Sequence, residues 1–514
     1  MTRHGVHSSA TLHSHVERRC DVCIVGSGAG GAVLAAQLAA RGLHVVILEE
    51  GGYHTAEDFD QTETTAFPLL YQESGGRATR DLAINILQGR CVGGGTTVNW
   101  TTCFRAPDST LARWRTKFGV EGLDGHTLTP HYEAVEKRLN IQLWPPGAAN
   151  ANNVVLQQGA ASLGWTTRTL RRNVRGCANT GYCGMGCPVG AKQSMTSTYI
   201  QDALSSGATL FTHTRVQRFR ARRARIVSIE AEVLDPKTNR TNGIRVEIRP
   251  KVAVCAAGAI NGPALLLRSS LDFNGRVGRR TFLHPAVLIV GEFDRKIHAS
   301  AGAPQVFSSH QFAHRGEHRV GFFVETAPVH PILASSVPRT FGVNYHKFMA
   351  KFDRISALIA LCEDGFVPGD EGGTVRLRWN GRAVLDYPIR PPLTEAFRAA
   401  HVALARLTLA GGAKTAHSTH THPLQISTNR HLARLDDAPY GAHEHYIGSA
   451  HQMGGCAMGA NKATSVVDSE LRHHEIPNLF VVDGSVFPTA LGVNPSETIY
   501  ALAHWAADTV ALAV

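Results

Sequence analysis

The 514-residue sequence is short of the features that mark several protein classes. It has no apolar run near the ~18 residues that a membrane-spanning helix requires, and its first 19 residues contain no apolar segment of a secretory signal. Internal repeats, long low-complexity tracts and nucleic-acid-binding modules are also missing. These absences predict a cytoplasmic globular protein with a disordered leader over residues 1–16 and no nucleic-acid partner. Peripheral contact with a membrane stays open.

The formal net charge is +11, although charged residues make up only 18% of the chain. One group of arginines stands apart, and its members alternate with other residues as the exposed face of a strand does: Arg215, Arg218, Arg220, Arg222, Arg223 and Arg225. This alternation favours a solvated face over a docking patch for anions.

The ten cysteines are dispersed and show no disulfide framework, which favours a reducing compartment. Only Cys177, Cys183 and Cys187 come close together, with the spacing C-x5-C-x3-C. Two interpretations remain open. The three thiols are either buried groups or a local disulfide in a tight loop, or else ligands of an iron–sulfur cluster or zinc.

The first apolar run, 22–25, leads into a glycine-rich turn and then an alanine-rich helical stretch, 32–40. A second apolar run, 45–48, ends at Glu49. This order is the β-turn-α-β opening of a dinucleotide-binding fold. Later strands at 252–257 and 479–482, followed by a last helix at 495–513, predict that the same fold is assembled from distant segments.

The fold class is therefore α/β, with a discontinuous Rossmann-like dinucleotide-binding domain and an α+β substrate domain. We assign the first domain to residues 17–105, 188–288 and 446–514, and the second, substrate-binding domain to 106–187 and 289–445. Two alternating runs, 374–379 and 384–389, flank Asn380-Gly381 and predict a hairpin in an antiparallel sheet of the second domain.

The turn after the first strand reads Gly26-Ser27-Gly28-Ala29-Gly30-Gly31 and fits G-x-G-x-x-G. Gly26 permits the tight turn, Gly28 lets a pyrophosphate approach the backbone, and Gly31 allows close packing of helix on strand. Glu49 follows Gly31 by 18 residues and suits the ribose hydroxyls.

A second glycine-rich loop, 89–100, contains Gly93, Gly94 and Asn99. Such a loop lets backbone lie against a large flat ring system, which favours FAD over NAD as the cofactor.

With these motifs the sequence resembles the glucose–methanol–choline (GMC) oxidoreductases, nearest to long-chain fatty alcohol oxidases and more distantly cholesterol oxidases. The most specific block runs from His451-Gln452-Met453-Gly454-Gly455 to Gly492-Val493-Asn494-Pro495. The resemblance implies that the backbone of Val216 contacts adenine and that Asp483 lies beside the flavin phosphate or ribityl chain. Val98 stands where some members attach flavin through a histidine, so we expect dissociable FAD.

The resemblance also implies the catalytic pair. Alcohol oxidation needs a base at the hydroxyl while hydride leaves the adjacent carbon, and an imidazole has a suitable pKa. The family places this base at His451 and an orienting amide at Asn494. Asn494-Pro495-Ser496-Glu497 also reads as a helix start with Asn494 at the N-cap, and the positive end of that helix would favour reduced flavin.

We therefore expect FAD-dependent oxidation of an alcohol, primary or secondary and apolar, to an aldehyde or ketone. The electron acceptor stays open between O₂ and a quinone or cytochrome. Two alternative functions remain. One is a dehydrogenase that passes electrons through an iron–sulfur cluster held by Cys177, Cys183 and Cys187, and the other is a non-catalytic flavin electron-transfer module. Two histidine groups complete the candidates: His417, His420 and His422 as metal ligands, and His443 and His445 at the substrate entrance.

Overall fold

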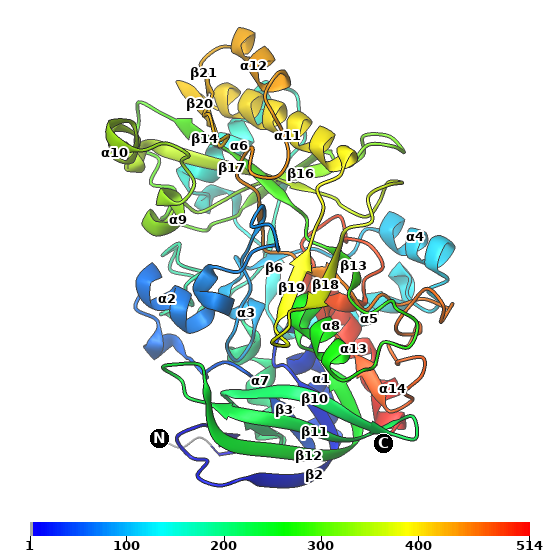
Figure 1. The fold of residues 1–514 in the computed structure, drawn as a ribbon. Coiled ribbons are helices and arrows are strands. Elements are labelled where there is room, and N and C mark those ends of the chain that lie inside the picture. Colours follow the sequence, from blue (N-terminus) through cyan, green and yellow to red (C-terminus); the bar gives the residue numbers. More distant parts are fainter. Residues whose placement is uncertain (1–3) are drawn as a thin grey trace.

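The computed structural model describes residues 4–514, which build two sheet-based halves stacked end to end (Figure 1). The lower half in Figure 1 contains both chain termini and the nucleotide-type sheet. The upper half contains a mainly antiparallel sheet covered by helices. The fold class predicted from the sequence is confirmed.

The lower sheet has eight strands in the order β1-β9-β3-β2-β12-β11-β10, with β24 also paired to β12. The strands from β1 to β12 and β24 are parallel, whereas β11 and β10 are antiparallel. Their bounds are β1 Val6–His7, β2 Val16–Val25, β3 Val45–Leu48, β9 Thr209–Phe211, β10 Thr214–Arg222, β11 Arg225–Leu234, β12 Thr241–Cys255 and β24 Leu479–Val481.

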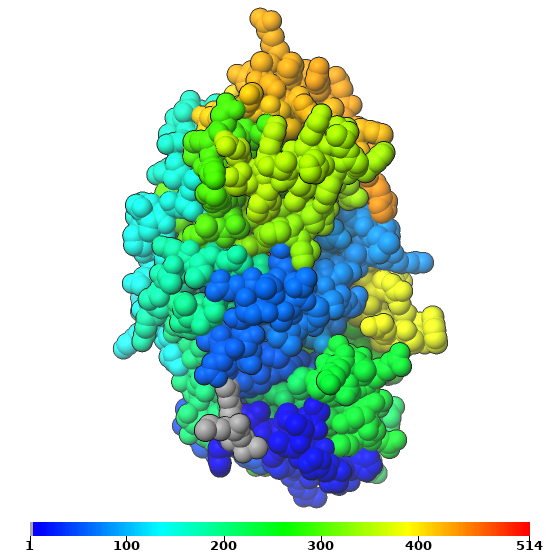
Figure 2. Space-filling view, turned by 90° about the vertical axis from the view of Figure 1, so that its left-hand side faces the viewer, coloured from blue at the N-terminus to red at the C-terminus, as the bar shows by residue number. Residues whose placement is uncertain are grey.

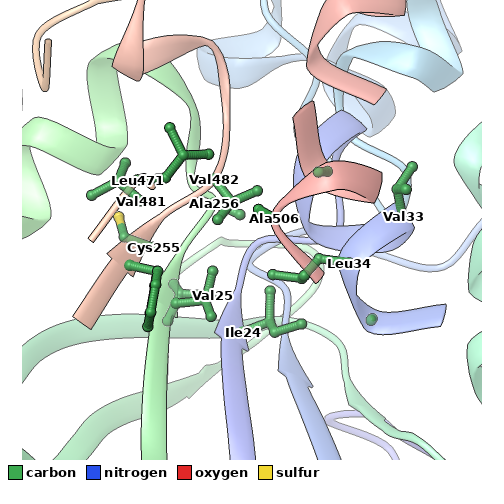
Figure 3. Packing of buried hydrophobic residues seen from close by; sticks show 14 of the residues in the cluster. Ile24, Val25, Val33, Leu34, Cys255, Ala256, Leu471, Val481, Val482 and Ala506 are labelled. Atoms are coloured by element: carbon green, nitrogen blue, oxygen red, sulfur yellow. The ribbon is translucent and has the colours of Figure 1, made fainter. Parts of the chain in front are cut away.

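Three segments far apart in the sequence meet in this sheet, as expected. The ends of β2, β12 and β24 lie side by side, and their apolar side chains pack with those of α1 (Ala29–Ala39), as Val25, Cys255, Val482 and Leu34 illustrate in Figure 3. Because parallel strands are buried on both faces, these runs are continuously apolar rather than alternating.

The upper sheet has nine strands, and its central order is β21-β20-β14-β17-β16-β15-β7. Long helix α11 (Pro391–Ala410) and α6 (Ala151–Ser162) contribute to its core. The strands are β4 Asn85–Ile86, β7 Arg168–Thr169, β14 Ala286–Glu292, β15 Phe307–Phe312, β16 Phe322–Thr326, β17 Ile355–Cys362, β20 Thr415–Ser418, β21 Gln425–Ile426 and β22 Gly448–Ser449.

Two smaller sheets join the halves. One contains the predicted hairpin, β18 (Gly373–Leu377) and β19 (Ala383–Asp386), with β13 (Arg279–Phe282) and β23 (Met453–Gly454); the other pairs β5 (Thr102–Cys103), β8 (Arg171–Asn173) and β6 (Ile141–Leu143). The remaining helices are α2 Glu63–Leu70, α3 Gly95–Val98, α4 Asp108–Phe118, α5 Gly125–Arg138, α7 Tyr199–Ser205, α8 Gly258–Arg268, α9 Pro331–Ser335, α10 Gly342–Met349, α12 Ala433–Asp436, α13 Ser496–Trp505 and α14 Ala507–Leu512.

The structure corrects two expectations about the ends of the chain. Residues 4–16 are not a disordered leader, since Val6–His7 adds a parallel strand to the edge of the sheet and Leu12 is buried; residues 1–3 lie outside the described part. The last helix is broken at Ala506, where α13 ends and α14 begins.

The proposed domain boundary at residue 106 does not coincide with a boundary between cores. Side chains of α4 and α5, such as Trp114 and Leu128, belong to the lower core, whereas those of α6 belong to the upper one. The segment 106–187 therefore links both halves.

Arginines of β10 lie along an antiparallel ladder, and Arg218 and Arg220 both pair with Glu230 of β11 at 2.6 and 2.5 Å. This matches the solvated strand predicted there. In residues 4–514, no helix has the length and apolar character needed to cross a membrane.

Candidate functional site

A cavity of about 1130 Å³ lies between the two halves and contains most of the predicted site residues. Its lining includes nine of them: Gly26, Gly28, Glu49, Gly94, Asn99, Val216, His451, Asp483 and Asn494. Gly31 and Gly93 do not line it. The cavity exceeds the usual ~300–1,000 Å³ of a ligand site, which suits a large cofactor together with a second ligand.

The first glycine loop has the geometry expected for a pyrophosphate site. Gly26 has φ +101°, and a Cβ at this position would overlap the carbonyl of Ala256. A Cβ at Gly31 would overlap the carbonyl of Gly26, which explains its role in packing. Gly28 instead faces the cavity and Gly94, so its backbone remains open to a ligand beside the start of α1.

Glu49 lies at the end of β3 and is buried. Its Oε2 accepts hydrogen bonds from the backbone N–H and the hydroxyl of Ser27 at 3.0 and 2.7 Å, and its Oε1 accepts one from Gly51 N–H at 2.8 Å. Burial raises the pKa of this carboxyl despite those donors. Glu49 thus ties the strand end to the first glycine loop while facing the cavity.

Residues that do not line the cavity hold the second glycine loop in place. Gly93 has φ +87° and donates its N–H to Ser27 Oγ at 3.1 Å, so it joins the two loops rather than lining the cavity. Buried Lys192 donates to the carbonyls of Thr97, Asn99 and Cys183 at 2.7, 2.7 and 3.0 Å. Burial lowers the pKa of Lys192 to about 8.

Val216 and Asp483 come from two different strands of the lower sheet, β10 and the end of β24. Val216 on β10 lines the cavity at its nucleotide side, next to Arg215 and Gln217. The Asp483 carboxylate follows β24 and accepts hydrogen bonds from Gly258 N–H at 2.7 Å and Ser485 N–H at 2.8 Å. It therefore anchors the start of α8 at the cavity wall.

His451 reaches the cavity just before β23. Its ring is buried enough that desolvation lowers its pKa to about 4. Its Nδ1 lies 3.2 Å from Nδ1 of His284, and its backbone N–H donates to Ser449 Oγ at 3.3 Å. His284 was not predicted from the sequence.

Asn494 also lines the cavity, and its surroundings reveal a second missed residue. Asn494 Nδ2 lies 3.4 Å from Oε2 of Glu325 on β16, which also accepts from Gln305 Nε2 at 2.7 Å. Oε1 of Glu325 and Oδ1 of Asn494 are buried without a hydrogen-bond partner. Burial raises the pKa of Glu325 to about 8.

The predicted N-cap role of Asn494 is wrong. Pro495 occupies the N-cap of α13, no side chain caps the helix, and the amide of Asn494 points to Glu325 instead. The difference comes from tertiary structure. Folding brings Asn494 next to the buried carboxyl of Glu325, which is 169 positions away in the sequence. Ser496 and Ile499 of the first helical turns still line the cavity.

The remainder of the cavity, on the side of the upper sheet, is largely apolar. Side chains from that sheet and from α9 and α10 line it: Leu288, Val290, Leu333, Ala334, Val337, Phe348, Ile355, Ala357, Ile359 and Leu361. Helix α9 is held by buried Glu63 of α2, whose carboxylate accepts hydrogen bonds from Ile332 and Leu333 N–H at 2.6 and 2.8 Å. In Figure 2 the blue segment with α2 lies directly beneath the yellow-green segment with α9 and α10.

The cysteine group does not form a metal site. Cys177, Cys183 and Cys187 are half-buried free thiols, and within residues 4–514 no three His, Cys, Asp or Glu side chains are arranged to hold a metal ion. Instead, Cys183 O accepts from Lys192, which also holds the second glycine loop, and Gly184 O accepts from the hydroxyl of Tyr71, at the end of α2, at 2.6 Å.

The two histidine groups lie apart from the cavity. His417 pairs with Glu292 at 3.2 Å, His422 is exposed, and His420 packs with His401 and His445 in a buried aromatic cluster, so the three candidate ligands are not together. His443 is exposed, and neither it nor His445 lines the cavity.

Sequence reasoning missed both His284 and Glu325, and of the two only Glu325 gave a local signal. Charged residues are almost never fully buried unless paired. A lone Glu325 within Phe322–Thr326 was therefore the one sequence clue to a buried functional carboxyl.

Comparisons with known proteins identify the family of the chain. The chain matches the GMC oxidoreductase family over residues 67–286 and 369–503, and an NAD(P)-binding Rossmann-like domain over residues 24–55. It is 33% identical to an uncharacterised GMC-type oxidoreductase of Mycobacterium tuberculosis, over 96% of this chain and 76% of that protein. It is 30% identical to a long-chain-alcohol oxidase of Arabidopsis thaliana, over 98% of this chain and 69% of that protein.

Solved structures support the fold. Pyridoxine 4-oxidase from Mesorbium loti superposes with a TM-score of 0.70 at 20% identity, covering 95% of this chain and 99% of that one. A formate oxidase superposes with a TM-score of 0.68 at 14% identity, covering 97% of this chain and 99% of that one.

Proposed function

Since the chain belongs to the GMC oxidoreductase family of FAD-dependent enzymes, we propose that it oxidises the CH–OH group of an alcohol to an aldehyde or ketone. One observation carries the proposal. A single cavity joins two glycine loops suited to a dinucleotide, a polar centre with His451 and Asn494, and an apolar region. The apolar walls favour apolar primary or secondary alcohols.

The cavity fits FAD. Gly26, Gly28 and Glu49 would hold the pyrophosphate and ribose, Val216 the adenine, and Gly94, Asn99 and Asp483 the flavin side, while Gly31 and Gly93 shape the loops. Bound flavin supplies the acceptor for hydride. Val98 offers no nucleophile for attachment, so we propose dissociable FAD.

Side chains of the protein position the substrate alcohol and accept the proton of its hydroxyl group. Asn494 positions the alcohol through its amide, and the hydroxyl proton passes to one of two titratable groups beside it. These are His451, as the family resemblance implies, and Glu325, whose Oε1 has no partner. The apolar walls exclude water from the reacting carbon.

The test is anaerobic flavin bleaching. Purified protein reconstituted with FAD is mixed with a series of primary and secondary alcohols of increasing chain length, and absorbance is followed in a stopped-flow instrument. We expect bleaching that speeds up with apolar chain length, and an Asn494→Ala variant slowed by about 10²-fold. Protein that holds FAD but is not bleached by any alcohol would refute the proposed function.

Admitting air to the reduced enzyme then shows whether O₂ is the electron acceptor. Reoxidation within the turnover time indicates an oxidase, and slow reoxidation indicates a dehydrogenase that uses a quinone or cytochrome. The absence of a metal-holding group in residues 4–514 weighs against an iron–sulfur route, and the presence of His451 and Asn494 weighs against a purely electron-transferring module.

We place the protein in the cytoplasm, as the dispersed free cysteines favour.

For peripheral membrane contact, the segment 327–352 fits best. It contains no acidic residue, carries Arg339, Lys347 and Lys351, and exposes Phe341 and Val343 (90% and 64%). Binding to vesicles containing anionic lipid should fall in Phe341→Ser but not in Trp379→Ser, an equally exposed aromatic on the β18–β19 turn. Equal binding of both variants would refute this contact.

A further inference from the structure

His330 is a buried polar side chain in the wall of the cavity. It is 3% exposed and belongs to the cavity lining. Within residues 4–514, neither of its ring nitrogens makes a hydrogen bond of normal geometry. The residue occupies the N-cap position of α9, but its side chain does not cap the helix. Because buried polar groups are almost always hydrogen-bonded, the ring indicates that a polar group of a ligand lies against it.

The ring of His330 is neutral at neutral pH and has one nitrogen free to accept a hydrogen bond. Burial lowers its pKa to about 4, and the backbone of Gly181 acts in the opposite direction. A carbonyl does so by attracting an N–H, so the single hydrogen of the neutral ring lies on the nitrogen toward Gly181. Tyr182 packs against the ring, with the two centroids 4.9 Å apart. The other nitrogen carries a lone pair that can accept from an O–H or N–H of a ligand.

His330 lies on the same stretch of chain as the polar centre of the cavity. Glu325 at the end of β16 lies beside Asn494, and residues 327–330 continue the cavity wall from there. Residues 327–329 are apolar. Five residues of chain span at most ~18 Å, so one ligand can reach from Asn494 to His330 along an apolar wall.

Building on the proposed function, we propose that His330 is a specificity-determining residue that accepts a hydrogen bond from a second hydroxyl group of the substrate. The substrate is then a diol. One hydroxyl lies at Asn494 and is oxidised, an apolar chain follows residues 327–329, and the other hydroxyl donates to His330. No bond of the substrate changes at His330, so this residue strengthens binding and leaves the rate of hydride transfer unaltered.

The surroundings of His330 favour a neutral hydroxyl over a carboxylate. The buried carboxylate of Glu63 lies close by, since it accepts hydrogen bonds from Ile332 and Leu333 N–H. A second negative charge here would be repelled by Glu63 and would not be compensated by a neutral imidazole. An ether oxygen has no hydrogen to donate and would leave the lone pair of His330 without a partner.

The first test compares three substrates of matched chain length by anaerobic bleaching of the FAD-loaded enzyme. They are an α,ω-diol, its monomethyl ether and the corresponding ω-hydroxy carboxylate. The dependence of the bleaching rate on substrate concentration gives the Kd and the limiting rate. At the best-fitting chain length we expect the diol to bind about 2- to 10-fold more tightly than the ether, at the same limiting rate, and the carboxylate to bind more weakly than either.

Variants then assign this preference to one side chain. His330→Leu should bind the diol no more tightly than the ether, and His330→Gln, whose amide oxygen can accept, should restore most of the preference. The matched control is His310→Leu, because His310 Nε2 is also buried without a partner but His310 does not line the cavity. It should keep the wild-type preference. FAD content and unfolding temperature identify the variants that fold; if His330→Leu does not, the wild-type and His330→Gln comparisons still decide.

The outcomes separate this inference from the proposed function. Bleaching by simple alcohols with no preference for the diol at any chain length overturns the role of His330 and leaves the function intact. So does a preference that persists in His330→Leu, or one that His310→Leu abolishes equally. If no alcohol bleaches the flavin, the function is refuted, while calorimetric titration of the FAD-loaded protein with the diol and the ether still tests the site at His330.

Discussion

The buried carboxyl group of Glu325 makes the stability of this protein depend on pH. Glu325 keeps its proton in the folded state up to about pH 8, whereas the unfolded chain loses it near its ordinary value of 4.5. The unfolded state therefore binds fewer protons between these values, and the free energy of unfolding falls as pH rises through this window.

We predict that Glu325→Gln removes this loss. The variant should unfold at a similar temperature to the wild type near pH 4.5 and at an increasingly higher temperature toward pH 8, with no further difference above it. Thermal unfolding at several pH values measures this. A stability difference that does not vary with pH would show that the carboxyl is not buried as described.

Glu49 is the second decisive carboxyl. Replacing it with glutamine sets an NH₂ group against the N–H and O–H donors of Ser27 or the N–H of Gly51. An unmet buried hydrogen bond costs ~1–3 kcal/mol, so we predict that Glu49→Gln weakens FAD binding by at least about fivefold in equilibrium titration. Glu17→Gln, at an exposed position of β2, is the control.

At the scale of elements, helix α13 begins at the cavity wall with Ser496 and carries no side-chain cap. Its positive end should favour the anionic reduced flavin. We predict that Ser496→Asp lowers the reduction potential of the bound flavin, measured against redox dyes. Ser109→Asp makes the same change in the first turn of α4, away from the cavity, and should leave the potential unchanged. Equal potentials in all three proteins would contradict this role of the helix.

Helix α9 depends on one carboxylate of another element. Glu63→Gln replaces an acceptor of two backbone N–H groups with an amide that accepts at one oxygen. We predict faster proteolysis within 331–349 and a KM for long-chain alcohols raised by several-fold, since α9 and α10 line the apolar region. Glu57→Gln, exposed nearby, should change neither. Identical proteolysis of the two variants would rule out the anchoring role.

For the whole molecule, the cavity separates two cores that share the link 106–187. A cofactor that binds there stabilises the folded state by mass action, by about 2.7 kcal/mol at a concentration 100 times its Kd. We predict that removing FAD lowers the unfolding temperature by several degrees and that adding it back restores the value. An apoprotein as stable as the holoprotein would contradict a cofactor in this cavity.

The sequence by itself determined the nucleotide half of the fold, the hairpin and most of the proposed cofactor residues that line the cavity, because these depend on local patterns: glycines at fixed spacing, continuous apolar strands and a turn at Asn380-Gly381. Only the tertiary structure decided that Val6–His7 joins the sheet, that Cys177, Cys183 and Cys187 form no metal-holding group, and that Asn494 faces Glu325 instead of capping a helix. It also brought His284 to His451 across 167 positions of sequence. Such contacts arise from the packing of strands distant in the chain, and no periodicity along the sequence encodes them.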